Sequence, residues 1–167
     1  MKKLIFTAMA FAVIGCNQNK KTEQKDDLQL QVDSINQARA KYNDSIQALN
    51  EANRFGDLSG SKTLSYKSDD SSININGTIN FQKTGRDLYD ISGNASSGKN
   101  TISINGTIKR VSEKHLNFEG EISQNINGSA YKRTKKTTFL NEGKGKFWRL
   151  QDKVNADGFV DYIDIKE

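Results

Sequence analysis

The chain has 167 residues and a formal net charge of +5, with no proline, one cysteine and one histidine. A single cysteine excludes an intrachain disulfide. With only one cysteine and one histidine, a metal centre built from clustered cysteine and histidine ligands is also excluded. The basic excess lies in residues 58–167, with seventeen basic and thirteen acidic side chains, which is less than the dense basic face that specific nucleic-acid binding usually needs.

The first sixteen residues have the pattern of a bacterial export signal. Two lysines precede an apolar run over residues 4–14, which is shorter than the ~20 apolar residues that a membrane-spanning helix needs. The run ends in "VIGC" at residues 13–16, which resembles the lipobox of bacterial lipoproteins. The resemblance implies that residues 1–15 are a signal peptide and that Cys16 is acylated. We therefore expect a lipid anchor in the outer membrane, facing either the periplasm or the cell surface.

A polar tether and a helix are predicted next. Residues 16–27 are almost wholly polar and predict a disordered tether. From residue 28 the apolar residues recur every seven positions, as Leu28, Ile35, Tyr42 and Leu49, while the companion series is Val32, Arg39, Ile46 and Asn53. This stripe predicts one long amphipathic helix over residues 28–55 that serves as a spacer. Two alternatives stay open: a coiled coil between copies, and docking onto the β domain or the membrane.

Two serines of the spacer are candidate modification sites. Asp33-Ser34-Ile35 and Asp44-Ser45-Ile46 resemble the Asp-Ser/Thr-aliphatic motif of general O-glycosylation in Bacteroidota. The resemblance implies that Ser34 and Ser45 carry a glycan, which would shield an exposed spacer from proteolysis.

From residue 59 onward the hydrophobic period changes to two, which is typical of half-buried strands. We predict eight strands, at residues 61–67, 72–82, 87–93, 101–111, 115–124, 130–140, 146–151 and 159–165. Short loops and no helical segment separate them, so residues 59–167 are predicted to form an antiparallel meander. The fold class is therefore mainly β, a small barrel or sandwich.

The stretches "ININGTINF" (residues 73–81) and "ISINGTIKR" (residues 102–110) nearly repeat each other. Asn-Gly is a strong hairpin signal, but a turn there would set apolar against polar side chains on both faces. A continuous strand instead places every isoleucine on one face, as burial requires. A third copy without Asn-Gly, "LNFEGEI" at residues 116–122, supports the continuous strand.

In this interpretation each repeat carries a glycine on its inward face, at Gly77, Gly106 and Gly120. An inward glycine weakens a strand unless a bend or a neighbouring group uses the space. We expect the second and third repeats to form a hairpin with Gly106 opposite Phe118. If side chains fill the interior, function lies on the surface of the domain, whereas an empty interior would be a ligand pocket.

The strongest charge cluster is "YKRTKKTTF" at residues 131–139. A central strand could not bury basic residues on both faces, so this segment is predicted to be an exposed edge strand. Lys132, Arg133, Lys135 and Lys136 are then either a solvated edge or a patch for an anionic polymer such as a polysaccharide.

No cofactor or metal site is predicted. Residues 153–164 partly imitate a calcium loop, but Lys153 stands where the first acidic ligand belongs, and a cation there would repel calcium. Asp161 and Asp164 have opposite strand parity, which argues against a shared acid–base role.

The C-terminal segments "KGKFWRLQ" (residues 144–151) and "DYIDI" (residues 161–165) resemble the ends of small flavobacterial lipoproteins. The resemblance implies that the protein comes from the Bacteroidota, and it supplies no activity. We expect Phe147 or Trp148 to be a core residue. The sequence predicts a non-enzymatic envelope lipoprotein that presents a β domain to a polysaccharide or protein partner. The alternative is a lipocalin-like carrier of a small ligand, or an enzyme inhibitor.

Overall fold

The computed structural model describes residues 19–69 and 72–167, with side chains from residue 26 onward in its helix. The chain divides into two compact units at residues 47 and 48, which are described separately. Cys16 and the predicted signal peptide lie outside the described residues. In the part that is described, no helix combines the length and apolarity needed to cross a membrane.

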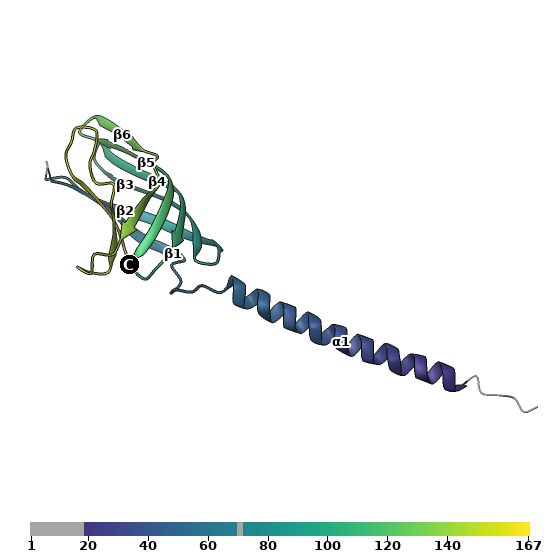
Figure 1. Cartoon of the computed structure of the whole chain (residues 1–167). Helices are drawn as coiled ribbons and strands as arrows, with labels where there is room; N and C mark the ends of the chain where they lie inside the picture. Colours follow the sequence, from purple (N-terminus) through teal and green to yellow (C-terminus); the bar gives the residue numbers. More distant parts are fainter. Residues whose placement is uncertain (1–18, 70–71) are drawn as a thin grey trace, which may run out of the picture. The chain divides into compact units, whose positions relative to one another are not determined.

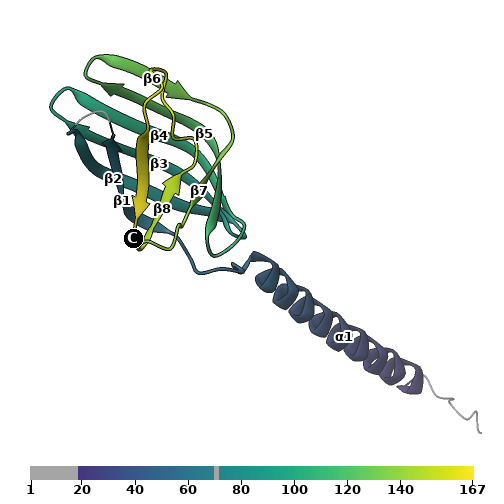
Figure 2. The same ribbon diagram turned by 60° about the vertical axis from the view of Figure 1, so that its left-hand side comes forward.

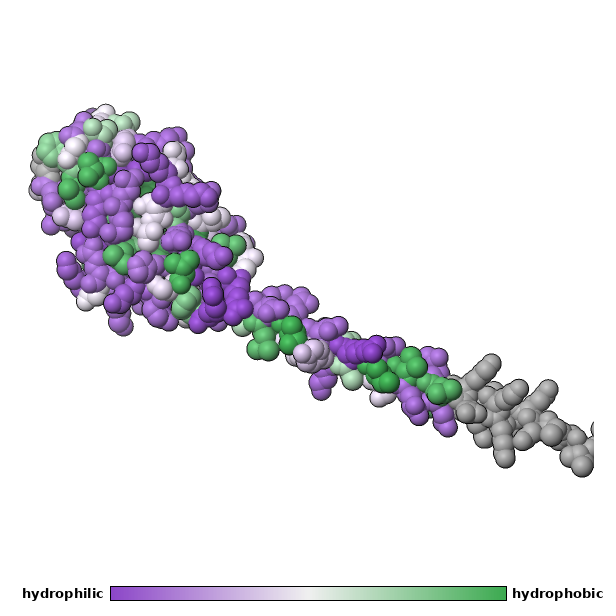
Figure 3. All heavy atoms as spheres, viewed as in Figure 1, coloured by the Kyte–Doolittle hydropathy of each residue, from purple (hydrophilic) through white to green (hydrophobic). Residues whose placement is uncertain are grey.

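The helix α1 spans Asn19–Glu51 (Figure 1). It begins inside the predicted tether, so the prediction of disorder up to residue 27 is wrong for residues 19–27. At 1.5 Å per residue its 33 residues extend for about 50 Å. The apolar stripe is exposed, with Tyr42 and Leu49 each 65% accessible, and apolar side chains are visible along the helix in Figure 3.

Nine antiparallel strands follow: β1 Gly60–Ser68, β2 Asn74–Gly85, β3 Leu88–Ser97, β4 Asn100–Arg110, β5 His115–Ile126, β6 Ser129–Arg133, β7 Thr137–Leu140, β8 Phe147–Leu150 and β9 Asp161–Lys166. Eight of them close a ring, because β1 pairs with both β2 and β9, and β4 pairs with β5 (Figure 2). The remaining strand, β6, lies outside this ring and pairs only with the last part of β5. The mainly β, antiparallel prediction is confirmed, and the domain is a barrel.

The predicted strand 130–140 is interrupted. Ile122 pairs with Arg133 and Phe118 pairs with Thr137, so β6 and β7 keep one common register against β5. Residues 134–136, which belong to neither strand, lie opposite Gly120 in this register. The sequence therefore predicted the strand but missed its break.

The continuous-strand interpretation of the repeats is confirmed. Gly77 lies inside β2 and pairs with Leu64 on one side and Ala95 on the other. Gly106 lies inside β4, but its partner is Gly120, and Phe118 pairs with Ile108. The predicted register was therefore two residues off, which preserves the inward parity of the isoleucines.

Backbone of the neighbouring strand fills the space beside these glycines. A Cβ atom on Gly77 would lie 2.1 Å from the carbonyl oxygen of Asn94, and one on Gly120 would lie 2.2 Å from that of Asn105. Gly93 of β3 has a similar close approach to Ile79. Four adjacent strands thus carry inward glycines where the neighbouring backbone comes close, and glycines at such positions allow a sheet to curve until it closes.

The barrel interior is filled with side chains. Twenty buried hydrophobic residues form one cluster, and its largest fully buried side chains are those of Tyr66, Tyr89, Phe81 and Phe139. Aromatic pairs such as Phe118 and Phe139, whose ring centroids are 5.9 Å apart, cross the core edge to face. Trp148 is buried here as predicted. The barrel is therefore a packed core and not an empty container.

Residues 53–58 seal the end of the barrel at which β1 begins. Leu58 is buried, and the Tyr89 hydroxyl accepts hydrogen bonds from the Leu58 N–H and the Asn53 side chain. The Asp87 carboxylate, which is fully buried, accepts the backbone N–H groups of Arg54 and Phe55. Burial acts to raise the pKa of Asp87, but these two donors and the Arg54 guanidinium outweigh it and lower the pKa.

Candidate binding pocket at the open end of the barrel

A buried ion pair lies inside the barrel at the end opposite the seal. Arg133 of β6 and Asp161 of β9 have side chains that are 1% and 0% exposed, with Nη2 and Oδ2 3.0 Å apart. Each reaches the interior because it continues the inward parity of its strand, Asp161 with Ile163 and Arg133 opposite Ile122. Neither charge is left without a partner, as burial requires.

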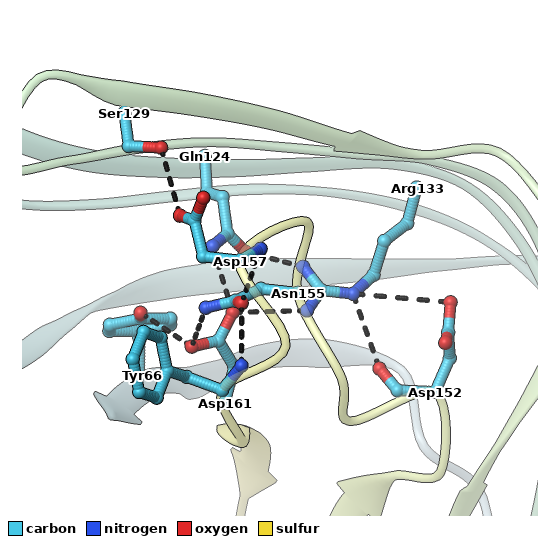
Figure 4. Close-up of polar contacts among 9 residues, drawn as sticks. Tyr66, Gln124, Ser129, Arg133, Asp152, Asn155, Asp157 and Asp161 are labelled. Atoms are coloured by element: carbon cyan, nitrogen blue, oxygen red, sulfur yellow. Dashed lines mark hydrogen bonds and ion pairs between the residues drawn. The ribbon is translucent and has the colours of Figure 1, made fainter. Parts of the chain in front are cut away.

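The Asp161 carboxylate collects three further hydrogen bonds (Figure 4). Gln124 Nε2 donates to Oδ2 at 2.8 Å, while the Tyr66 hydroxyl and Asn155 Nδ2 donate to Oδ1 at 2.8 and 3.2 Å. Gln124 also accepts a hydrogen bond from Arg133. Burial, and then the adjacent carboxylate, raise the pKa of Tyr66, so its hydroxyl keeps its proton and remains a donor. The network is satisfied and fixes the floor of the pocket.

A loop over residues 151–160 covers part of this end. The Asn155 side-chain oxygen accepts the N–H groups of Asp157 and Phe159, both at 3.0 Å. Gly158 has φ of 85°, a left-handed conformation that favours glycine. Asp157 accepts a hydrogen bond of 3.3 Å from Ser129 at the start of β6. The loop is thereby tied to the turn between β5 and β6.

Between the loop and this turn lies a pocket of about 140 Å³. Its walls combine three aromatic rings with amide, carboxyl and hydroxyl groups, from Tyr66, Tyr131, Phe159, Gln124, Asn127, Asn155, Asp157, Ser68 and Ser129. Three larger depressions, of about 360–410 Å³, are more open and are lined mainly by outward-facing strand residues. The pocket at the barrel end differs from them in having a buried polar network as its floor.

A family comparison covers nearly the whole described chain, matching the PM1083 family over residues 20–167. The chain belongs to the PM1083 family. The match begins after residues 13–16, so the lipoprotein assignment of this PM1083 family member remains a prediction. No curated protein matches the chain.

Among solved structures, the chain is similar to a redesigned β-barrel, with 12% sequence identity and a TM-score of 0.44. The similarity covers 66% of this chain and 90% of the designed one.

The four basic residues of the predicted patch do not share one face: Arg133 is buried, and the three lysines are exposed. Arg133 is buried in the ion pair, so its assignment to an exposed patch is wrong; its strand parity turns it inward. Lys132 pairs with Glu121 at 3.0 Å and Lys136 pairs with Glu119 at 2.7 Å on the outer face. The hydrogen bond from Lys132 lowers the pKa of Glu121. Lys135 is exposed. The patch therefore contains acidic as well as basic groups.

The remaining predicted sites have these positions. Ser34 and Ser45 are exposed on α1, and the Ser45 hydroxyl donates to the Tyr42 carbonyl at 2.6 Å. Asp161 faces the interior, whereas Asp164 lies on the outer face and pairs with Arg149 at 2.8 Å, as their parity predicted. Among the described residues, no three acidic, histidine or cysteine side chains are grouped as metal ligands.

Sequence reasoning missed the pocket and its floor, although part of the signal was present. Gln124 continues the inward parity of Phe118 and Ile122, and Asp161 continues that of Ile163. A polar residue at an inward position predicts a buried partner of complementary chemistry. That Arg133 is the partner depends on strand pairing, which the sequence pattern did not reveal.

Proposed function

We propose that this PM1083 family member is a lipid-anchored envelope protein that presents its barrel as a binding module, without catalysis. The observation that carries this proposal is the filled interior: large side chains and close strand backbone occupy the space that a ligand carrier would need. Binding is then a property of the surface, and the pocket at the open end, with its buried polar floor, is the candidate site. The helix α1 serves as a spacer between anchor and barrel.

Acylation of Cys16 is tested by fractionation and mass spectrometry. Full-length protein expressed in a bacterium with lipoprotein processing is expected in the membrane fraction, with its N-terminal peptide beginning at an acylated Cys16. The Cys16→Ser variant is expected to give no acylated peptide and to keep residues 1–15, because it lacks the thiol that is acylated. A wild-type protein with an unmodified cysteine would overturn the anchor. Protease treatment of intact cells then decides the orientation, because only a surface-facing barrel is cleaved.

The filled interior is tested against the carrier alternative with an apolar probe. A fluorescent fatty acid analogue is expected to show no saturable binding to the folded protein, because the core holds side chains. Saturable binding that a non-fluorescent fatty acid displaces would favour the lipocalin-like carrier and contradict the surface-binding proposal. A lipid-free serum albumin sample provides the positive control for the probe.

A further inference from the structure

We propose that the pocket at the open end of the barrel binds one neutral sugar ring, such as the terminal residue of a polysaccharide. This inference rests on the proposed binding function and names the ligand class of its pocket. Size is the first argument. The pocket holds about 140 Å³, close to the ~150 Å³ of a cavity that takes up one benzene molecule. A sugar ring with its hydroxyl groups is larger than benzene, so the pocket would enclose part of the ring and leave the rest in its open mouth. It is too small for a nucleotide or for a lipid chain.

The chemistry of the walls is the second argument. A sugar ring presents C–H groups on its faces and hydroxyl groups around its rim. Tyr131 and Phe159 supply aromatic surfaces, which attract C–H groups through their electron-rich faces, and Phe159 is 46% exposed. Asn127 and Asp157 supply amide and carboxyl groups that exchange hydrogen bonds with hydroxyls. Asn155 adds one N–H, because its oxygen and its other N–H are already used within the protein.

Charge is the third argument. No lysine or arginine is among the described residues that line the pocket. The nearest buried cation, Arg133, is neutralised by Asp161. Asp157 is the one acidic residue in the described lining, so a phosphate, sulfate or uronic acid would meet repulsion without a compensating cation. A neutral polyhydroxylated ligand therefore suits the site better than an anionic one.

Preorganisation is the fourth argument. The Arg133 guanidinium lies 4.6 Å from the centre of the Tyr131 ring, so the ion pair that forms the floor also positions an aromatic wall. Asn155 and Asp157 are held by hydrogen bonds within the loop and to Ser129. These groups are in place before a ligand arrives, which reduces the ordering cost of binding.

The test is a titration of the ¹⁵N-labelled, full-length Cys16→Ser protein with single sugars. The panel contains methyl glucopyranoside, methyl galactopyranoside, methyl mannopyranoside and N-acetylglucosamine, with glucuronate and glucose 6-phosphate as anionic counterparts. We expect at least one neutral sugar to shift the amide resonances of residues 127–131 and 155–159 with a millimolar dissociation constant. The anionic counterpart of that sugar is expected to bind at least about tenfold more weakly.

Matched variants locate the site. Phe159→Ala removes an exposed ring and is expected to weaken sugar binding by about tenfold or more, with an unchanged melting temperature. Tyr42→Ala removes an exposed aromatic residue of α1 and is expected to leave binding unchanged. Asp157→Asn is expected to restore part of the binding of the anionic sugars, because it removes the acidic group of the described lining.

Three outcomes would overturn the sugar site. They are the absence of any shift at about 50 mM neutral sugar, shifts that Phe159→Ala leaves intact, and a preference for the anionic sugars in the wild type. Binding of an envelope polysaccharide that Phe159→Ala does not alter would remove the pocket assignment but leave the proposed binding function standing. Failure of the anchor is read separately, from the N-terminal peptide of the wild-type protein.

Discussion

At the scale of single residues, Asp161 organises the open end of the barrel. Its carboxylate joins β1, β5, β6 and the covering loop through Tyr66, Gln124, Arg133 and Asn155. A second arginine–aspartate pair, between Arg149 and Asp164, lies on the outer face, where the Arg149 side chain is 21% exposed. The same chemistry is thus present in two environments, and burial sets the cost of breaking each pair.

We predict that Asp161→Ala lowers the free energy of unfolding by about 3–5 kcal/mol. The buried Arg133 guanidinium would keep only the partly exposed Asp152 carboxylate, 4.0 Å away. The buried donors Tyr66 and Gln124 would lose their acceptor.

Asp164→Ala is the control and is expected to cost less, about 1–2 kcal/mol. The Asp164 side chain is 10% exposed, but Arg149 retains Glu142 and access to water. Chemical denaturation followed by tryptophan fluorescence measures both. Equal losses in the two variants would contradict the role assigned to burial.

The inward glycines give a second prediction at this scale. Gly77→Ala places a Cβ atom against backbone of β3 and is expected to cost about 3 kcal/mol. Gly85→Ala lies in the same strand, but its nearest neighbours are 3.6 Å or more away and belong to a side chain. That control is expected to change stability by less than about 1 kcal/mol. A neutral Gly77→Ala would show that curvature of the barrel does not depend on this close approach.

Single residues also show where sequence reasoning succeeds. The inward parity of the isoleucines and of Gly77, Gly106 and Gly120 followed from burial alone, because a strand has only two faces. The error of two residues in the Gly106 register arose because parity leaves every even shift equally acceptable. Arg133 was wrongly assigned to the surface because basic residues were assumed to lie outside. That rule fails here because Asp161 of β9 supplies a buried carboxylate.

At the scale of elements, α1 carries an apolar stripe with one basic interruption. Val32 and Ile46 lie on one side of the stripe with Arg39 between them, and a charged residue at such a position weakens a coiled coil. We predict that the Cys16→Ser chain is a monomer at about 10 μM and that Arg39→Leu shifts it toward a dimer. Sedimentation velocity measures the change.

Lys41→Leu supplies the control for this prediction. It adds the same apolar side chain to α1 but lies off the stripe, so it is expected to leave the sedimentation coefficient unchanged. A wild-type chain that already sediments as a dimer would contradict the spacer interpretation and support a coiled coil.

The sealing segment, residues 53–58, predicts a pH dependence. The pKa of Asp87 is lowered in the folded protein from 3.8, so its hydrogen bonds contribute stability above the unfolded pKa. That contribution is lost as the pH falls through the folded value. We expect the free energy of unfolding to decrease below about pH 4, and to do so less steeply in Asp87→Asn. Parallel pH profiles of the two proteins would exclude this carboxylate as a source of acid sensitivity.

Elements were easier to predict than their junctions. All eight predicted strands exist, because period-two alternation and short loops are local signals. The break at residues 134–136 was not predicted, and the loop between the last two strands was predicted without its contacts. The break depends on how β6 and β7 pair with β5, and the position of the loop depends on the Ser129–Asp157 hydrogen bond; both join residues that are distant in sequence.

At the scale of the whole molecule, the barrel is expected to keep its thermal stability without α1 but to lose part of it without its seal. A chain of residues 52–167 is predicted to keep the melting temperature of the longer chain within a few degrees. A chain of residues 60–167 loses the burial of Leu58 and the donors to Asp87, and is expected to melt about 10 °C lower. Differential scanning calorimetry compares the two. Equal melting temperatures would show that the seal is dispensable.

The two ends of β1 have different mechanical surroundings. The seal, residues 53–58, leads into β1, which begins at Gly60. The pocket lies beside Tyr66 and Ser68 at the other end of that strand. Tension applied through a membrane anchor would first pull on the contacts of residues 53–58 with Asp87 and Tyr89. It would reach the pocket only after those contacts had yielded. Because the seal lies between the anchor and β1, its contacts would break first under tension, and the pocket would keep its geometry until they broke.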